Sequence, residues 1–407
     1  MLVVPSSAEL LNTVLGALRV GIVPVPVYPS LTPAELDGLV ADAQPALVVR
    51  EGAVLTELEA SDPVDIADVP LARPMHYTSG TTGMPKGVWS GVLDDGAARA
   101  LLDEEAALWE FERGDRHLVC SPLHHSAPIR FAAGTLLAGG EVTVLDRFDP
   151  AAFAAAVAEL EPTTAFLVPA HLQRLRQHGL QPVSSFRLLT HAGAPCPAPL
   201  KRWAHDIFGR RSVWEFYGST EGQFTACTAE EWENRPGTVG RARPGRRLST
   251  DRDGTIWCEV PDHARFTYWR DPERTAEAWR DGAFTVGDLG RLDEDGYLWL
   301  EGRRDDLIIS GGVNVYPAEV ERALADAPGV AEVAVFAVDD DRWGQRVCAA
   351  VVGGTTAEDV LRFAEERLAP FKRPKQVVVV GELPRTGMGK VVRRELERLL
   401  PPSTTGT

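Results

Sequence analysis

The fold of this chain follows from one stretch, Tyr77-Thr78-Ser79-Gly80-Thr81-Thr82-Gly83-Met84-Pro85-Lys86-Gly87. Its glycines allow backbone N–H groups to approach an anion closely. The hydroxyls of Thr78, Ser79, Thr81 and Thr82 can donate to phosphate oxygens, and Lys86 adds a positive charge of the kind that binds phosphate. It is not a Walker A loop, because Lys86 follows a proline and precedes Gly87. The stretch therefore predicts a phosphate-binding loop of another kind.

Length and composition limit the class of protein. With 407 residues, the chain exceeds the usual size of a single core, so two or three subdomains are expected. A net charge of −16 disfavours nucleic acid or an anionic membrane as a partner. The five cysteines include no Cys-x-x-Cys pair, which indicates free thiols rather than a zinc site or disulfides. No basic-apolar leader or membrane-length apolar run is present, so we predict a soluble, cytoplasmic protein without stable membrane insertion.

The predicted elements alternate between strand and helix. We expect a helix over 8–20, a strand over 21–27, a second helix from Thr32 capped by Ser30, and a strand over 46–49. Further along, the expected strands are 118–120, 141–145, 165–168 and 186–190, and the expected helix is 151–160. This alternation predicts largely parallel sheets covered by helices, with ligands at the carboxyl ends of the strands.

After Arg303 the pattern changes to that of a small α/β unit. The expected strands are 307–310, 333–338, 347–352 and 376–380, and the expected helices are 317–327 and 357–368. We therefore predict an N-terminal domain over 1–304, a C-terminal domain over 305–400 and a disordered tail over 401–407.

A second motif, Trp214-Glu-Phe-Tyr-Gly-Ser-Thr-Glu221, combines a short apolar strand with a polar turn. The ring of Tyr217 can stack on a purine, Thr220 can donate to an α-phosphate, and Glu221 can hold Mg²⁺. Taken alone, the same residues would also suit a capping turn between a strand and a helix.

The two motifs, in this order, resemble those of the adenylate-forming superfamily, which includes acyl-CoA synthetases, luciferases and the adenylation domains of nonribosomal peptide synthetases. This resemblance implies an α/β fold with a large N-terminal domain of mixed, largely parallel sheets flanked by helices, and a small mobile α+β C-terminal domain. It assigns ATP or AMP binding to two loops and the turn of the second motif, namely Thr78, Ser79, Gly80, Thr81, Thr82, Gly83 and Lys86, then Gly193, Ala194 and Pro195, then Tyr217 and Gly218.

The resemblance also assigns roles in the C-terminal third of the chain. Asp288 would accept the ribose hydroxyls, and Arg303 would contact ribose or phosphate. Further along, Asp305 would be the hinge, Gly311, Gly312 and Trp343 would line the tunnel for CoA, and Lys390 would be the catalytic lysine. Without the resemblance, Lys390 would be taken for a surface lysine and the charged run 303–306 for a solvated linker.

The segment Ser121-Pro-Leu-His-His-Ser-Ala-Pro128 matches the family's acid-pocket element, with His125 at its histidine position. Amino-acid adenylation domains carry an aspartate near this point to bind the substrate ammonium. Because this chain has none there, we expect a plain carboxylic acid, fatty or aromatic. The alternative for His125 is a structural histidine.

These assignments imply a ligase that uses ATP, Mg²⁺ and CoA. It would form acyl-AMP with release of pyrophosphate, with Lys390, Glu221 and Thr220 at the reacting phosphate, and would then transfer the acyl group to CoA. Two alternatives are transfer to an amine or a carrier-protein thiol, and a catalytically silent nucleotide-binding protein. The chain departs from the family at Val313, at Gln345 and in the short, irregular stretch 246–268. These departures bear on the predicted thiol acceptor and on a possible homodimer interface more than on the predicted adenylation step.

Overall fold

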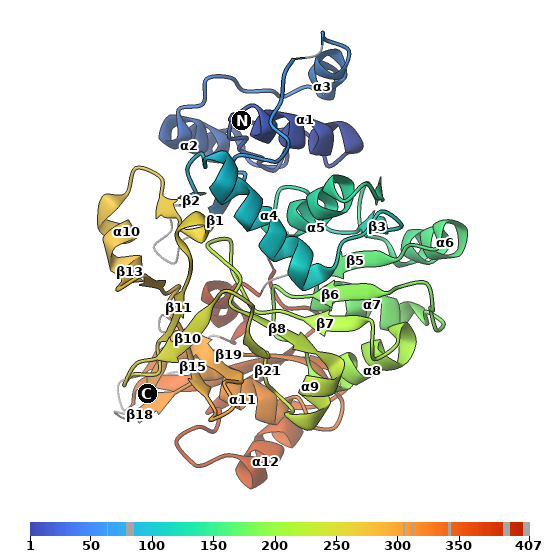
Figure 1. The fold of residues 1–407 in the computed structure, drawn as a ribbon. Helices are drawn as coiled ribbons and strands as arrows, with labels where there is room; N and C mark the ends of the chain where they lie inside the picture. Colours follow the sequence, from blue (N-terminus) through green and yellow to red (C-terminus); the bar gives the residue numbers. More distant parts are fainter. Residues whose placement is uncertain are drawn as a thin grey trace. The chain divides into compact units, whose positions relative to one another are not determined.

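The computed structural model describes residues 1–62, 64–78, 85–303, 306–310, 313–340, 343–385 and 391–401. The chain forms two compact units, Met1–Ser249 with Trp257–Val286, and Thr250–Ile256 with Gly287–Thr407 (Figure 1). The predicted boundary at 304 therefore falls inside the second unit. The hinge predicted at Asp305 lies outside the described residues and stays a prediction.

A seven-stranded sheet forms the framework of the first unit, in the order β4-β3-β5-β6-β7-β8-β9. Five strands are parallel: β3 (Arg116–Val119), β4 (Glu141–Val144), β5 (Thr164–Leu167), β6 (Leu188–His191) and β7 (Val213–Glu215). Two antiparallel strands, β8 (Thr225–Thr228) and β9 (Arg241–Ala242), complete one edge. The predicted parallel sheet is thus confirmed. Every residue of β5 and β6 is buried, as expected for strands covered on both faces.

Helices connect and cover these strands. They are α4 (Asp95–Trp109), α5 (Ser126–Leu137), α6 (Pro150–Leu160), α7 (Pro169–His178), α8 (Ala198–Phe208) and α9 (Ala229–Asn234). The side chain of Asp149 caps α6 by accepting from the Ala151 and Ala152 amides at 3.0 Å each, and Pro150 occupies a position where no amide donor is needed.

The N-terminal part differs from the prediction. Helices α1 (Ala8–Arg19), α2 (Pro33–Ala43) and α3 (Gly52–Glu59) are present. The strands predicted over 21–27 and 46–49 were wrong, since each contributes only an isolated bridge to Leu2. Prolines at 24 and 26 remove the amide donors that a continuous ladder needs. Thr32, not Ser30, caps α2, in a capping box with Glu35.

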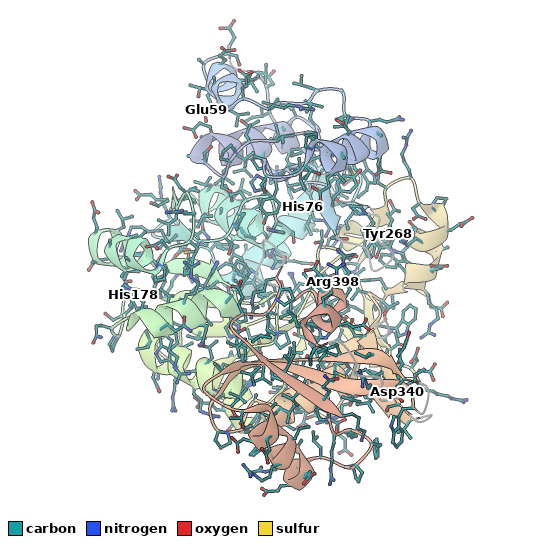
Figure 2. All side chains as sticks on the ribbon, turned by 180° about the vertical axis from the view of Figure 1, so that it is seen from behind. Glu59, His76, His178, Tyr268, Asp340 and Arg398 are labelled. Atoms are coloured by element: carbon teal, nitrogen blue, oxygen red, sulfur yellow. The ribbon has the colours of Figure 1, made fainter. Side chains whose placement is uncertain are left out.

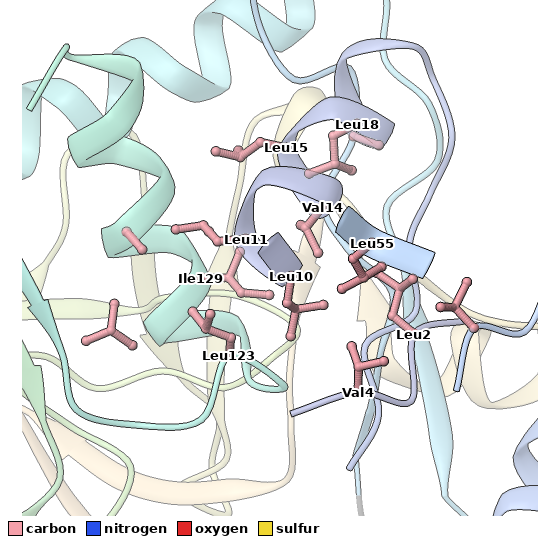
Figure 3. Close-up of a cluster of buried hydrophobic side chains, with 14 residues drawn as sticks. Leu2, Val4, Leu10, Leu11, Val14, Leu15, Leu18, Leu55, Leu123 and Ile129 are labelled. Carbon is pink, nitrogen blue, oxygen red and sulfur yellow. The ribbon is translucent and has the colours of Figure 1, made fainter. Parts of the chain in front are cut away.

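A cluster of buried aliphatic side chains joins this part to α5 (Figure 3). Leu10, Leu11 and Val14 of α1 are at most 2% exposed and share the cluster with Leu123 and Ile129. The packing fixes the start of α5, where the acid-pocket segment lies.

Two smaller antiparallel sheets complete the first unit. One contains β1 (His76–Thr78), β2 (Lys86–Trp89) and β12 (Thr267–Tyr268). The other contains β10 (Arg247–Thr250), β11 (Ile256–Glu259), β14 (Ala283–Phe284) and β13 (Trp279–Arg280), and the 3-10 turn η1 (Asp262–Ala264) and helix α10 (Pro272–Ala278) lie beside them in sequence. The stretch 246–268 is therefore a series of short strands.

The second unit contains a hairpin and a five-stranded sheet. The hairpin joins β15 (Asp288–Leu292) to β16 (Leu298–Arg303), and Asp293 Oδ1 accepts from the amides of Asp295 and Tyr297 at 3.1 and 2.8 Å in the predicted turn. The sheet has β18 (Val313–Val315), β17 (Ile308–Ser310), β20 (Gly344–Gly353), β19 (Val330–Asp340) and β21 (Gln376–Val380), with α11 (Pro317–Leu324), α12 (Ala357–Arg367) and the 3-10 helix η3 (Arg393–Leu399). All six elements predicted after residue 306 are present. The helix expected to reach 327 ends at Leu324, and the strands predicted over 333–338 and 347–352 each begin three residues earlier than expected.

All five cysteines are free, as predicted. Within the described residues, no helix is both long enough and apolar enough to span a membrane.

Candidate active site

The hairpin of β1 and β2 holds the two ends of the predicted phosphate loop. Thr78 and Lys86 are register partners, so the loop leaves and re-enters the sheet at one point. Residues 79–84 lie outside the described part of the chain, and the roles predicted for Ser79, Gly80, Thr81, Thr82 and Gly83 stay predictions. Thr78 Oγ1 is buried and has no hydrogen-bond partner among the described residues.

Lys86, Glu221 and Tyr268 form a compact polar triad. The ammonium of Lys86 lies 3.1 Å from Glu221 Oε1 and donates to the Tyr268 hydroxyl at 2.8 Å, and that hydroxyl donates to Glu221 Oε1 at 2.9 Å. Lys86 Nζ also lies 4.2 Å from the centre of the Tyr268 ring. Tyr268 was not predicted. It reaches the triad because β12 pairs with β2, Tyr268 opposite Val88.

Electrostatics fix the protonation states in this triad. Burial raises the pKa of Glu221, but the charge of Lys86 and hydrogen bonds lower it by more. The pKa of Glu221 is therefore below its ordinary value. Burial, and next the charge of Glu221, raise the pKa of Tyr268. At neutral pH Glu221 is therefore an anion and Tyr268 is protonated, in agreement with the hydrogen-bond directions. Figure 2 shows Tyr268 and His76, which belong to the same three-stranded sheet.

Glu221 fits the role of a Mg²⁺ ligand. It is an ionised carboxylate, 3% exposed, in the turn that follows β7. No group of three or more His, Cys, Asp or Glu side chains among the described residues could enclose a metal. A single carboxylate suits Mg²⁺, because that ion is usually held by one or two carboxylates together with the phosphates of a substrate. The residues present therefore fit a magnesium ion that arrives with ATP.

The turn that carries Thr220 and Glu221 is closed by a bridge between Gly218 and Gln223. A Cβ on Gly218 would lie 2.8 Å from the Cα of Gln223, so only glycine allows this approach. The Tyr217 ring is 9% exposed and packs on Phe224 with ring centres 4.8 Å apart. Stacking of Tyr217 on adenine and contact of Gly218 and Thr220 with the nucleotide stay predictions.

The second predicted nucleotide loop emerges next to this turn. Gly193, Ala194 and Pro195 follow β6, the parallel neighbour of β7, where His191 is in register with Glu215. Gly193 has a φ of +91°, which favours glycine. Both loops thus leave the carboxyl edge of the sheet side by side, as expected for a ligand site in a parallel sheet.

A buried ion pair lies at the end of β7, where the turn that carries Thr220 and Glu221 begins. Lys201 Nζ of α8 lies 2.5 Å from Glu215 Oε2, and both residues are less than a tenth exposed. The ring of His191 is buried beside the pair, and burial, followed by the charge of Lys201, keeps its pKa well below the ordinary value. His191 is therefore neutral and adds no second positive charge beside the Lys201–Glu215 ion pair.

Histidines gather where the acid-pocket segment meets β1. His125, the residue that precedes α5, forms a hydrogen bond through Nε2 with the Tyr28 hydroxyl. His76 Nδ1 lies 3.0 Å from the carbonyl of His124, and His124 Nε2 lies 2.8 Å from the carbonyl of Val4. Burial lowers the pKa of His125 to about 3 and that of His76 to about 4. His125 is therefore a neutral polar group in a constrained position. The pocket role of the segment stays a prediction, and the structure places His76 and Tyr28 beside it.

The remaining predicted residues belong to the second unit. Asp288 and Arg303 are register partners in the β15–β16 hairpin, so their backbones are adjacent, and Asp288 is 8% exposed. The Trp343 amide donates to Asp340 Oδ1 at 3.1 Å. Gln345 Oε1 accepts from the Ile309 amide at 2.9 Å, a structural role at the position where the family has an acid. Asp305, Gly311, Gly312 and Lys390 lie outside the described residues, as does the side chain of Arg303.

Comparison with known proteins agrees with this geometry. The family model described as AMP-binding enzyme matches residues 1–74 and 72–251, and the model described as AMP-binding enzyme C-terminal domain matches 319–390. The chain belongs to the adenylate-forming superfamily. It is 33% identical to an indoleacetate–CoA ligase of Aromatoleum aromaticum, over 98% of this chain and 88% of the relative.

Solved structures of the family share the fold. ATP-bound MatB from Rhodopseudomonas palustris is 31% identical, with a TM-score of 0.85 over 98% of this chain and 87% of that one. The o-succinylbenzoate CoA synthetase MenE from Bacillus subtilis, in complex with the acyl-adenylate intermediate OSB-AMP, is 25% identical, with a TM-score of 0.85 over 97% and 87% of the two chains. The predicted fold class, a large α/β domain with a smaller C-terminal domain, is confirmed.

Proposed function

We propose that this protein is an acid–thiol ligase. It would condense a carboxylic acid with ATP to give acyl-AMP and pyrophosphate, and then transfer the acyl group to the thiol of CoA. The observation that carries the proposal is the Lys86–Glu221–Tyr268 triad, because it joins the phosphate-loop hairpin to a magnesium-type carboxylate through direct contacts. The CoA ligase and synthetase names of the relatives support the choice of CoA.

The first half-reaction requires two anions to meet. The acid's carboxylate attacks the α-phosphorus of ATP in line with the departing pyrophosphate, the new P–O bond forming as the bond to the leaving oxygen breaks. Lys86 would hold the departing phosphates beside the loop, and Thr220 would donate to the α-phosphate. A magnesium ion on Glu221 would supply further positive charge. Lys390 would add its ammonium at the reacting phosphate.

The second half-reaction needs a different approach to the carbonyl. The thiol of CoA, as its thiolate, attacks the acyl carbon, and AMP leaves with the bonding electron pair. Rotation about Asp305 would withdraw Lys390 and bring Gly311, Gly312 and Trp343 towards the site, a hinge motion of the kind used by enzymes with two half-reactions. Asp288 and Arg303 would keep the ribose in place throughout.

The acid is proposed to lack an ammonium group, because the pocket segment around His125 offers no aspartate. The named relatives act on indoleacetate and o-succinylbenzoate, which makes aryl acids the first group to test, with fatty acids the second. Cytoplasmic location, a carrier-protein acceptor and a homodimer stay predictions.

Mass spectrometry of the products tests the proposal. The protein is incubated with ATP, Mg²⁺ and a panel of aryl, short and fatty acids, with and without CoA. An acyl-CoA product supports the proposal, whereas acyl-AMP that persists despite CoA would indicate an amine or carrier acceptor. No acid-dependent AMP from any acid would contradict it. Glu221→Gln is expected to abolish pyrophosphate release, and Glu259→Gln, at an exposed carboxylate paired with Arg247, is the matched control.

A further inference from the structure

A cluster of buried and half-buried charges adjoins the turn that carries Glu221, since Arg243 Nη1 donates to Gln223 Oε1 at 3.3 Å. It contains four guanidinium groups and two carboxylates, those of Arg73, Arg130, Arg243, Arg246, Glu104 and Glu105. Arg73 Nη2 donates to the carbonyl oxygens of Ala264 and Arg265 at 3.4 and 3.1 Å, next to His263, which contacts Glu104. Burial, and next the charge of Arg246, lower the pKa of Arg73 to about 10. Positive charge therefore exceeds negative charge in a region only partly open to water, which favours the binding of a further anion there.

The two carboxylates are already engaged by other groups. Glu105 Oε1 accepts from Arg243 Nη1 at 2.5 Å, and its Oε2 accepts from the Trp109 indole at 3.2 Å. Glu104 lies 2.8 Å from Arg246 Nη2 and 2.6 Å from His263 Nε2. Among the residues that the structure describes, the cluster thus has no further carboxylate for its remaining guanidinium groups.

Arg130 keeps two unpartnered donors although a carboxylate lies close to it. Its Nε lies 3.4 Å from Glu105 Oε2 without hydrogen-bond alignment, and neither Nε nor Nη2, both buried, has a hydrogen-bond partner in the described part of the chain. Burial lowers the pKa of Arg130. The charge of Glu105 raises this pKa and the charge of Arg243 lowers it, and the pKa remains below its ordinary value. Two buried donors on a charged group are therefore left for a ligand to satisfy.

The position of Arg130 indicates which ligand that is. Arg130 lies on α5, the helix that His125 precedes, and its guanidinium carbon is 5.1 Å from the ring centre of Phe216. Phe216 immediately precedes Tyr217 at the carboxyl edge of the sheet. The guanidinium thus lies between the acid-pocket segment and the nucleotide turn. About a quarter of its side chain, 26%, is exposed, although Nε and Nη2 themselves are buried.

The neighbouring aromatic cluster limits the length of that ligand. The rings of Trp109, Phe131, Phe166 and Phe216 are each at most 6% exposed. Ring centres are 5.0 Å apart for Trp109 and Phe131 and 5.7 Å apart for Trp109 and Phe216. At these distances the rings touch, so an alkyl chain could pass between them only by displacing a ring.

We propose that Arg130 binds a second carboxylate of the acid, and that the protein activates a short dicarboxylic acid. The inference rests on the proposed function and deepens it by naming the substrate class. One carboxylate would attack ATP, while the other would form charge-assisted hydrogen bonds with Arg130 and supply the missing negative charge. Monocarboxylic acids of the same length would leave Arg130 unsatisfied.

Matched acid pairs test the proposal. Acid-dependent pyrophosphate release is measured for malonate against propionate, succinate against butyrate, glutarate against pentanoate and phthalate against benzoate. In at least one pair the diacid is expected to exceed its partner in kcat/KM by roughly 10- to 100-fold, the worth of a hydrogen bond to a charged group. Equal or better use of every monocarboxylic acid would overturn the proposal.

Variants assign the preference to Arg130. Arg130→Met is expected to remove the preference for the diacid while KM for ATP stays within a factor of two, and Arg130→Lys is expected to retain part of it. The control is Arg174→Met, because Arg174 also lies over a phenylalanine ring, 5.1 Å from that of Phe148, but on α7. A rise in KM for ATP with unchanged diacid preference would overturn the proposal and assign Arg130 to the nucleotide.

A binding measurement separates this inference from the proposed function. Thermal unfolding is followed with α,β-methylene ATP and each diacid, so that no turnover is needed. Stabilisation by a diacid that is lost in Arg130→Met supports the subsite even if no acid is turned over, in which case the proposed ligase activity alone fails. Absence of stabilisation by every diacid, together with efficient turnover of monocarboxylic acids, would leave the proposed function standing and refute the subsite.

Discussion

Replacement of Tyr268 by phenylalanine is expected to weaken the link between the phosphate loop and Glu221. The hydroxyl of Tyr268 accepts from Lys86 at 2.8 Å and donates to Glu221 at 2.9 Å, and the side chain is almost fully buried. Phenylalanine keeps the ring that lies 4.2 Å from the ammonium and removes only the two hydrogen bonds. The substitution therefore isolates the contribution of the hydroxyl.

The size of the effect follows from the charges of the partners. A hydrogen bond to a charged group contributes roughly 1.5–3 kcal/mol. The direct Lys86–Glu221 contact at 3.1 Å survives, so each charged group keeps one partner and the expected loss is about 2 kcal/mol. For a unit of this size, this loss corresponds to a fall in the melting temperature of roughly 2–4 °C.

Thermal and urea-induced unfolding without nucleotide measure the loss, and Tyr28→Phe is the matched control. Tyr28 forms its hydrogen bond with His125, which is neutral because burial lowers its pKa to about 3, so the control is expected to lose only about 1 kcal/mol. The folded-state pKa of Glu221 is lowered, so its stabilisation is present above about pH 4.3 and disappears as the pH falls further. The difference between wild type and Tyr268→Phe should therefore shrink in acid.

Equal losses for Tyr268→Phe and Tyr28→Phe would refute the reasoning, because charge would then make no difference. A loss that persists unchanged at low pH would also refute it. Acid-dependent pyrophosphate release provides an independent readout, for which about 2 kcal/mol predicts a roughly 30-fold lower kcat/KM for ATP.

Three further outcomes are expected. Burial lowers the pKa of both His76 and His117 to about 4, below the ordinary value of about 6.5. As the pH falls from about 6.5 to about 4, each histidine therefore lowers the free energy of unfolding by up to about 1.4 kcal/mol per pH unit. Urea titrations at several pH values will measure this loss. Gly240→Ala is expected to cost about 3 kcal/mol, because its φ is +93° and the new Cβ would lie 2.1 Å from the Ala226 carbonyl oxygen; unchanged urea unfolding would contradict this. Lys390→Ala should abolish acyl-AMP formation yet leave transfer from supplied acyl-AMP to CoA largely intact, and loss of both half-reactions would contradict the role assigned to Lys390.

Local patterns were sufficient where short-range chemistry decides the outcome. The parallel strands of the first unit and six elements of the second could be predicted because their apolar runs and caps act within a few residues. The same reasoning failed at 21–27 and 46–49, where bridges to Leu2 replace strands. Strand formation in both stretches depends on a distant partner, and in 21–27 prolines also remove amide donors.

The sequence by itself identified the phosphate loop, the acid-pocket segment and the nucleotide turn. Each is a run of neighbouring residues whose chemistry can be recognised without the fold. Only the tertiary structure decided which distant side chains complete them. Tyr268 lies 182 residues from Lys86, and no local pattern marks its hydroxyl as a partner. Likewise, the unbalanced charge of Arg130 becomes visible only when α4, α5 and the segment 243–246 pack together. Charge balance in a buried cluster is a sum over elements remote in sequence, and folding alone brings them within reach of one another.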